Sequence, residues 1–250
     1  MTLRDVMNVL DSIAPFDTAE EWDNSGLQVG DPGSDVRRVI VALDATQDVI
    51  DEAVASEASL IVTHHPLIMK PLLRLDLGRC LPSRIETLVT HGIGIVSMHT
   101  NLDRAPGGTA DTLAGRLGLE DTSGHGYLRV GKVTGSPSVQ EWLARLGLGG
   151  ARICDARRRV EAVGACPGSG MGLWEEAFRL GCDTFVTGDV RYHDARDAVD
   201  AGMNVVDLGH FATEELVVEP LARLLKRQLK GVEVVAFRGK DVFASLDNTN

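Results

Sequence analysis

Short apolar runs alternate with helix-patterned segments along the chain, and this alternation constrains the fold more than any other feature. Strands are expected near residues 39–43, 60–62, 93–98, 128–133, 160–165, 183–187, 203–208 and 232–237. Helices are expected over 3–13, 48–57, 82–90, 109–117, 138–146, 171–180, 191–201 and 214–229, with Thr2 as the N-cap of the first. The segment 22–30 is expected to be a turn-rich loop. Because strands that alternate with helices form sheets covered on both faces, the sequence predicts an α/β fold.

The two halves of the chain resemble each other. The segment 59–63 compares with 183–187, and 91–96 compares with 201–206, and a polar cluster follows each strand. We therefore predict two similar α/β halves, residues 1–125 and 126–250, with the C-terminal strand able to pack back on the first half. The loop 122–126 is the expected boundary. Strand ends of both halves would then face one ligand-binding cleft.

Charge and composition exclude several classes of protein. The net charge is −11, which disfavours nucleic-acid binding and suits cations, or small anionic substrates held through cations. The four cysteines form no CxxC pair, which is typical of reduced thiols in a cytoplasmic protein. No apolar run approaches the ~20 residues of a membrane-spanning helix, so we expect a cytoplasmic protein with no membrane association.

Histidines and carboxylates gather just beyond the predicted strands. The histidines are His64, His65, His99 and His210, and the accompanying carboxylates are Asp103, Asp189 and Glu214. Imidazole nitrogens and carboxylate oxygens are ligands of zinc, manganese, iron and related divalent ions. Pro66 favours an extended His65, so that adjacent imidazoles diverge and suit two ions better than one. His210 and Glu214 are four residues apart, which places them on one side of a helix, and Glu214 is our choice of bridging ligand.

Each of these residues also has a less specific interpretation. The pair His64 and His65 could be polar residues of a surface loop. We expect His99 to pack beside a ligand and orient it rather than to bind the metal itself. His193 could be a proton shuttle or a residue of a helix surface. The segment Trp22-Asp23-Asn24 more readily forms a packed turn than a catalytic element.

Several motifs occur together in one order along the chain. They are WDNSGLQVG at 22–30, THHP at 63–66, HTNLD with PGG at 99–108, GD with a following histidine at 188–193, and GHFATE at 209–214. As a set they resemble the Nif-three-like dinuclear-metal-centre proteins, known as GTP cyclohydrolase I type-two homologues. The resemblance covers nearly the whole chain. It implies two α/β halves with a metal cleft and five ligands, which fall on His64, His65, Asp103, His210 and Glu214.

The resemblance also implies an assembly and an activity. It implies a toroidal homo-hexamer, built as a trimer of dimers, with two divalent ions per subunit that the sequence cannot assign among Zn, Fe, Mn, Ni and Co. We expect a metal-dependent hydrolase of a nucleotide or related small metabolite, with Glu214, His193 and His99 as candidate catalytic residues. Many relatives have two histidines where this chain has Tyr192-His193. The alternative function is a non-catalytic, metal-binding hexameric scaffold or regulator.

Overall fold

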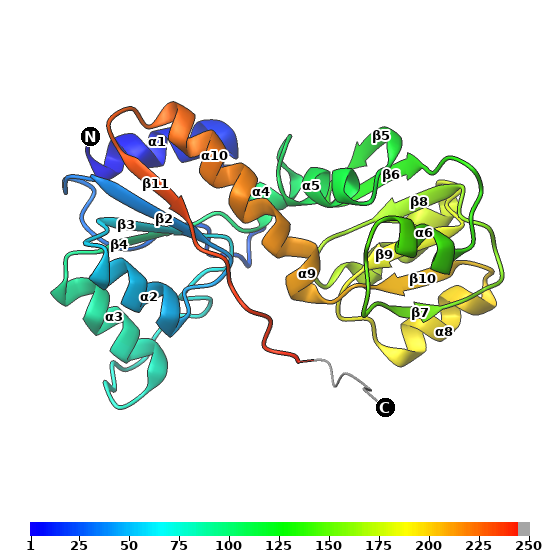
Figure 1. Cartoon of the computed structure of the whole chain (residues 1–250). Coiled ribbons are helices and arrows are strands. Elements are labelled where there is room, and N and C mark those ends of the chain that lie inside the picture. The colour runs from blue at the N-terminus through cyan, green and yellow to red at the C-terminus, as the bar shows by residue number, and fades with distance from the viewer. Residues whose placement is uncertain (245–250) are drawn as a thin grey trace, which may run out of the picture. The chain divides into compact units, whose positions relative to one another are not determined.

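The computed structural model describes residues 1–244, and these form two compact units (Figure 1). The first unit comprises Met1–Gly108 and Val217–Gly239. The second comprises Thr109–Leu216 and the segment that begins at Lys240. Each unit has its own β-sheet with helices packed on it, so the predicted α/β fold is confirmed.

The first unit contains a five-stranded sheet with the order β1-β4-β3-β2-β11. The strands are β1 (Gly26–Val29), β2 (Arg38–Ala42), β3 (Leu60–Thr63), β4 (Gly94–Ser97) and β11 (Glu233–Ala236). β2, β3 and β4 are parallel, and Thr63 at the end of β3 lies opposite Ser97 at the end of β4. β11 adds to β2 in parallel, and β1 adds to β4 antiparallel. The residues that follow β3 and β4 are therefore neighbours in space.

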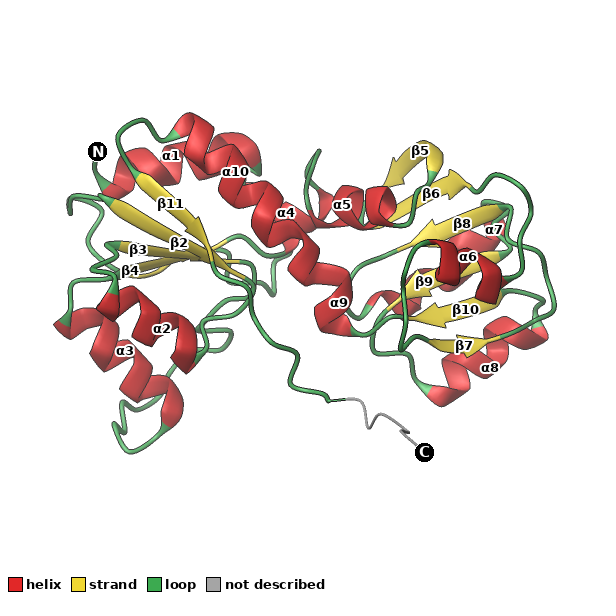
Figure 2. Ribbon diagram, viewed as in Figure 1, coloured by secondary structure: helices red, strands yellow, loops and turns green. Residues whose placement is uncertain are grey.

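Helices cover both faces of this sheet (Figure 2). α1 (Leu3–Ile13) and α10 (Val218–Gln228) lie on one face, and α2 (Gln47–Ala55) and α3 (Cys80–Thr90) lie on the other. Side chains alternate across a strand, so every second residue of β2, β3 and β4 packs against α2 and α3; these are Ile40, Ala42, Ile61 and Ile95. The predicted N-cap is confirmed, because the Thr2 hydroxyl accepts from Asp5 N at 3.3 Å within a capping box.

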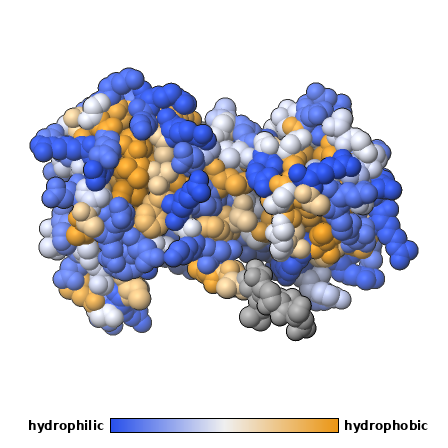
Figure 3. Space-filling view, in the orientation of Figure 1, coloured by the Kyte–Doolittle hydropathy of each residue, from blue (hydrophilic) through white to orange (hydrophobic). Residues whose placement is uncertain are grey.

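β11 is one of the two edge strands of the first sheet, and it leaves one hydrophobic side chain exposed on the surface. Val235 is 41% exposed. Figure 3 shows hydrophobic residues gathered over β11. An exposed apolar edge strand offers unpaired backbone groups and apolar side chains to another chain.

The second unit contains a six-stranded sheet with the order β5-β6-β8-β9-β10-β7. The strands are β5 (Glu120–His125), β6 (Leu128–Lys132), β7 (Arg152–Cys154), β8 (Ala162–Ala165), β9 (Thr184–Thr187) and β10 (Asn204–Asp207). β8, β9 and β10 are parallel, so this sheet also has neighbouring carboxyl ends. β5, β6 and β7 extend it through antiparallel pairs.

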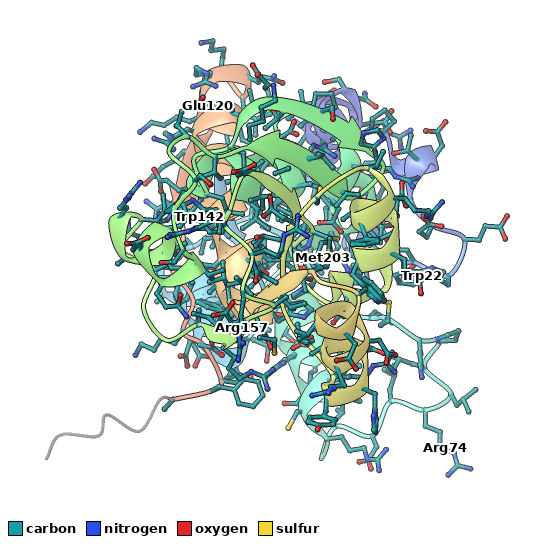
Figure 4. The ribbon with its side chains drawn as sticks, turned by 90° about the vertical axis from the view of Figure 1, so that its right-hand side faces the viewer. Trp22, Arg74, Glu120, Trp142, Arg157 and Met203 are labelled. Carbon is teal, nitrogen blue, oxygen red and sulfur yellow. The ribbon has the colours of Figure 1, made fainter. Side chains whose placement is uncertain are left out.

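The core of the second unit lies on both faces of its sheet. On one face, α5 (Thr109–Arg116) and α6 (Val139–Arg145) contribute Leu113 and Trp142, which pack against alternate residues of β8, β9 and β10. On the other face, α7 (Trp174–Arg179) and α8 (Tyr192–Asp200) pack against a cluster that contains Phe185 and Met203. Trp142 and Met203 are labelled in Figure 4.

Two short helices begin just beyond strands and carry predicted ligands. In the first unit α4 (Thr100–Arg104) follows β4 and carries Asp103. In the second unit α9 (His210–Glu214) follows β10, and its first and last residues are both predicted ligands. The segment predicted as one helix over 214–229 is helical but not continuous, because Glu214 ends α9, a 3-10 helix covers Glu215–Val217 and α10 begins at Val218.

Two loop predictions are also wrong. Residues 26–29, expected within a loop, form β1, whose backbone pairs with β4 although its side chains show no simple polar alternation. Residues 122–126 were expected to form a boundary loop, but most of them belong to β5, a fully exposed strand that pairs with β6. Backbone pairing with a neighbouring strand stabilises both segments, and neither has the hydrophobic pattern from which a strand would be predicted. None of the described helices combines the length and the apolarity that a membrane-spanning helix requires.

Candidate metal centre

His64 and His65 follow directly after β3, at the carboxyl edge of the first sheet. His64 N donates to Ala42 O at 3.2 Å, and His65 N donates to Leu43 O at 2.9 Å. These bonds continue the pairing of β2 with β3 beyond the last residue of the strand. Both histidines are thereby held by the backbone at the edge where α/β sheets place their ligand sites.

The two rings are oriented by acceptors at Nδ1. His64 Nδ1 lies 2.9 Å from Met98 O, and His65 Nδ1 lies 2.7 Å from Asp44 Oδ1. A carbonyl or carboxylate oxygen accepts hydrogen bonds, so Nδ1 carries the hydrogen in both rings. In a neutral ring the lone pair is then on Nε2, which is the arrangement of metal-binding histidines whose other nitrogen is bonded to an oxygen.

Asp103 lies against the ring of His64. Its Oδ1 is 3.4 Å from His64 Nε2, and both residues are buried. A carboxylate oxygen and an imidazole lone pair face each other favourably only when a cation, either a proton or a metal ion, lies between them. The structure thus brings together two of the predicted ligands in an arrangement that attracts a cation.

His99 brings a third imidazole to this edge. His64, His65 and His99 each offer one possible ligand atom, and these three atoms lie within 4.8 Å of one another. His99 Nδ1 lies 2.7 Å from Asp23 Oδ1, so its orientation comes from a residue far away in the sequence. His99 was expected to orient a neighbouring ligand through a ring nitrogen; Nδ1 is bonded to Asp23, so Nε2 is the nitrogen to which this expectation applies, and it stays a prediction.

The second unit pairs His210 with Glu214 as the four-residue spacing predicted. His210 Nε2 lies 2.9 Å from Glu214 Oε2 across one turn of α9. Glu214 is buried, and His210 is partly exposed. This pair repeats the relation between His64 and Asp103, with an imidazole nitrogen facing a carboxylate oxygen.

Asp189 orients the ring of His210. Asp189 Oδ2 lies 2.7 Å from His210 Nδ1 and accepts from Ser169 Oγ at 2.6 Å. Burial alone would raise the pKa of Asp189, but the hydrogen bonds from Ser169 and His210 outweigh it and lower the pKa below its ordinary value. The ionised carboxylate accepts from Nδ1 and leaves His210 Nε2 directed at Glu214.

A glycine-rich loop at residues 166–172 contacts this pair, and the sequence analysis missed it. Gly168 has a positive φ of +58°, and a Cβ there would overlap Glu214 Oε1. Its N–H donates to Thr213 Oγ1 at 3.0 Å, which ties the loop to α9. The sequence signal is the run CPGSGMG after a predicted strand, because a loop with so many glycines indicates a close approach of the backbone to other groups.

His193 is the second residue of α8. It is exposed, and its ring packs edge-on against Tyr192 with 5.3 Å between ring centroids. The expected contribution of His193 as a proton shuttle stays a prediction.

The donors of each unit suit a divalent ion. They are imidazoles and carboxylates, the groups that bind zinc and the neighbouring transition metals. Their outer hydrogen bonds, from Met98 O, Asp44 and Asp189, are those that fix ligand orientation in metal proteins. The fit is therefore to one or more metal ions rather than to an organic cofactor.

Comparison with known proteins gives one family and many similar chains. The family model described as Duf34/NIF3 (NGG1p interacting factor 3) matches residues 1–241. A Clostridium perfringens protein named "GTP cyclohydrolase 1 type 2 homolog" is 34% identical, with 97% of this chain and 99% of that protein covered. A Helicobacter pylori protein named "GTP cyclohydrolase 1 type 2" is 31% identical, with 85% and 86% covered.

The fold is likewise found in solved structures. A Staphylococcus aureus protein superposes with a TM-score of 0.92 at 28% identity, and the match covers 98% of this chain and 99% of that one. A Thermus thermophilus protein superposes with a TM-score of 0.83 at 27% identity, covering 97% and 100%. The matches span both units, so the arrangement of elements within each is common to these proteins.

Proposed function

Because the chain belongs to the Duf34/NIF3 family, we propose that it is a divalent-metal protein in which five donors hold two ions. The donors are His64, His65 and Asp103 of the first unit and His210 and Glu214 of the second. Glu214 is proposed as the ligand that both ions share, since a carboxylate can span ions about 3.5–4 Å apart.

One observation carries this proposal. In each unit an imidazole whose Nδ1 is bonded to an oxygen turns its Nε2 toward a carboxylate, His64 toward Asp103 at 3.4 Å and His210 toward Glu214 at 2.9 Å. Two lone pairs that face each other repel unless a cation lies between them. A proton or a metal ion meets this requirement, and an Nδ1 bonded to an oxygen in both rings is the arrangement typical of metal-binding histidines.

The proposed reaction is hydrolysis of a nucleotide or related small metabolite. When bound, divalent ions supply Lewis-acid chemistry that activates water and polarises phosphoryl or carbonyl oxygens. The chain's own contribution is orientation: Asp44 and Asp189 hold imidazoles in place, and Gly168 leaves room for the Glu214 carboxylate. The names of the similar proteins support GTP as the first substrate to test.

The test uses the purified full chain with measured metal content. Turnover of GTP and of a panel of phosphoesters is followed by chromatography for wild type, Glu214→Gln and Glu219→Gln, with and without chelator. Glu219 lies in α10 with an exposed side chain and serves as the control. Metal-dependent turnover that Glu214→Gln abolishes and Glu219→Gln retains supports the proposal, and equal turnover by all three proteins refutes it. Metal binding without turnover of any substrate would support the alternative, a metal-holding scaffold or regulator.

We also propose that the chain assembles as a homo-hexamer. The family resemblance motivates this, and the exposed hydrophobic edge of β11 supports self-association. Light scattering after size-exclusion chromatography would give a mass of six times 26.8 kDa. A mass of 26.8 kDa at all tested concentrations would refute it.

A further inference from the structure

Trp22 is a large aromatic side chain that the fold leaves mostly in solvent. It is 64% exposed, whereas Trp142 is buried in the core of the second unit. The side chain of Trp22 is labelled in Figure 4. The sequence predicted a packed turn over 22–24, and the Asp23 side chain is fully buried, but the indole beside it is not. A single exposed apolar residue is ordinary on a protein surface, so the exposure of Trp22 has meaning only through its surroundings.

The main chain on both sides of Trp22 is held by Thr100, the first residue of α4. On one side, Glu20 N donates to Thr100 Oγ1 at 3.0 Å, and Asp23 N donates back to Glu20 O at 2.9 Å. On the other side, Asp23 Oδ2 accepts from Thr100 N at 3.1 Å and from Thr100 Oγ1 at 2.6 Å. Trp22 therefore projects from a fixed turn. An aromatic side chain with two torsions on a fixed backbone loses little entropy when a ligand covers it.

The indole lies directly beside the imidazoles of the candidate metal centre. The ring centroids of Trp22 and His99 are 6.0 Å apart, and the two rings are nearly perpendicular, with 80° between their planes. The His99 ring centroid is in turn 5.3 Å from that of His64, one of the proposed ligands. In a perpendicular contact the edge of one ring meets a face of the other, so His99 covers at most one face of the indole. At least one flat apolar face therefore stays open to a ligand at the rim of the metal centre.

We propose that Trp22 is the platform on which the heteroaromatic base of the substrate stacks. This inference rests on the proposed function, because it takes a nucleotide, or another substrate with a base, to be what the site binds. Unpaired bases commonly stack on aromatic side chains, since every base has a π-face. Divalent ions attract the oxygen atoms of a substrate whatever its organic part, whereas a stacking indole distinguishes a substrate with a base from one without. Trp22 is thus a specificity residue, and the hydrolytic step stays with the metal centre.

Binding of GMP and of ribose 5-phosphate to the zinc-loaded full chain tests the inference, because the two probes differ only in the base. Calorimetry gives both affinities for wild type, Trp22→Leu and Trp22→Phe. The control is Phe178→Leu, which removes another exposed aromatic ring, on α7. We expect Trp22→Leu to lower GMP affinity by about 5- to 150-fold, the usual effect of losing one stacked base, and to leave ribose 5-phosphate affinity unchanged. Trp22→Phe should keep most of the GMP affinity, and Phe178→Leu should keep all of it.

Tryptophan fluorescence gives a second measurement that does not depend on affinity. The difference between the spectra of wild type and Trp22→Phe isolates the emission of Trp22. We expect GMP to change this emission and ribose 5-phosphate to leave it unchanged. Tryptophan is also frequent at the centre of protein interfaces, so quenching by acrylamide measures whether Trp22 is accessible in the assembled protein. A Trp22 that acrylamide does not reach would lie between copies of the chain, which overturns the inference.

The outcomes separate this inference from the proposed function. Equal GMP affinity in wild type and Trp22→Leu overturns the inference, and so does an equal loss of affinity for GMP and ribose 5-phosphate, which would indicate a general structural effect. Circular dichroism checks that each variant is folded, and the fluorescence response of the wild-type chain decides if Trp22→Leu is not. Metal-dependent turnover of a substrate that lacks a base, with no preference for GMP over ribose 5-phosphate, overturns this inference alone. A wild-type chain that binds neither zinc nor GMP overturns both.

Discussion

Gly168→Ala is the substitution whose effect on the metal centre the structure specifies most closely. The Gly168 N–H donates to Thr213 Oγ1 at 3.0 Å, and its carbonyl accepts from Gly188 N at 2.8 Å, so the backbone is held on both sides. A methyl group there would overlap Glu214 Oε1 and lie 3.1 Å from Glu214 Cδ and 3.4 Å from His210 Cε1. The flexible Glu214 side chain must therefore move, and its carboxylate leaves the position beside His210.

The substitution should lower both the stability toward unfolding and the metal affinity, and a control variant separates these two effects. Alanine at a positive φ destabilises the folded chain by about 1–2 kcal/mol, wherever it occurs. Gly126 in the turn between β5 and β6 has a φ of +60°, close to the +58° of Gly168, but nothing lies within 4 Å of a Cβ there. Gly168→Ala should lose at least as much stability toward unfolding as Gly126→Ala, because it also displaces the buried Glu214 carboxylate from His210. Only Gly168→Ala should lose metal affinity, by at least about tenfold or 1.4 kcal/mol.

Urea unfolding followed by tryptophan fluorescence measures the first cost, and competition with a zinc chelator measures the second. The proteins compared are wild type, Gly168→Ala and Gly126→Ala, unfolded without metal so that the two measurements stay independent. If Gly168→Ala binds zinc as tightly as Gly126→Ala does, Glu214 is not a ligand in the orientation described here.

Three further predictions concern other parts of the chain. Asp189→Asn should lower zinc affinity by about 10- to 100-fold through a misoriented His210, without loss of stability from the backbone, because asparagine tolerates the positive φ of +53° at this position. Hydrogen bonds from Ser138, the N-cap of α6, lower the pKa of Glu141 below its ordinary value of 4.5. The ionised Glu141 should therefore stabilise the folded chain at pH values above 4.5. The difference in unfolding free energy between wild type and Glu141→Gln should disappear as the pH falls from 4.5 through the lowered pKa of the folded chain. Burial raises the pKa of the Cys182 thiol to about 11, so mass spectrometry after iodoacetamide treatment at pH 8 should find the exposed Cys80 labelled in the folded chain and Cys182 labelled only after unfolding.

The sequence by itself determined those features that depend on near neighbours in the chain. The apolar runs located β2, β3 and β4 to within a few residues, because a strand buried on both faces needs a continuous apolar segment. The spacing of His210 and Glu214 predicted their contact, since residues four apart meet on any helix. The position of His64 and His65 after a strand was likewise a local property.

Only the tertiary structure decided which distant residues support these groups. Asp23 and His99 are 76 residues apart, and Asp189 and His210 are 21 apart, and no periodicity links either pair. β1 and β5 form because a neighbouring strand offers backbone partners, which a local pattern does not reveal. Hydrophobic periodicity records how a segment meets the core, whereas the choice of a hydrogen-bond partner depends on where the completed fold brings a remote segment. For that reason the sequence could indicate the donors, and the fold alone could show which oxygen atoms orient them.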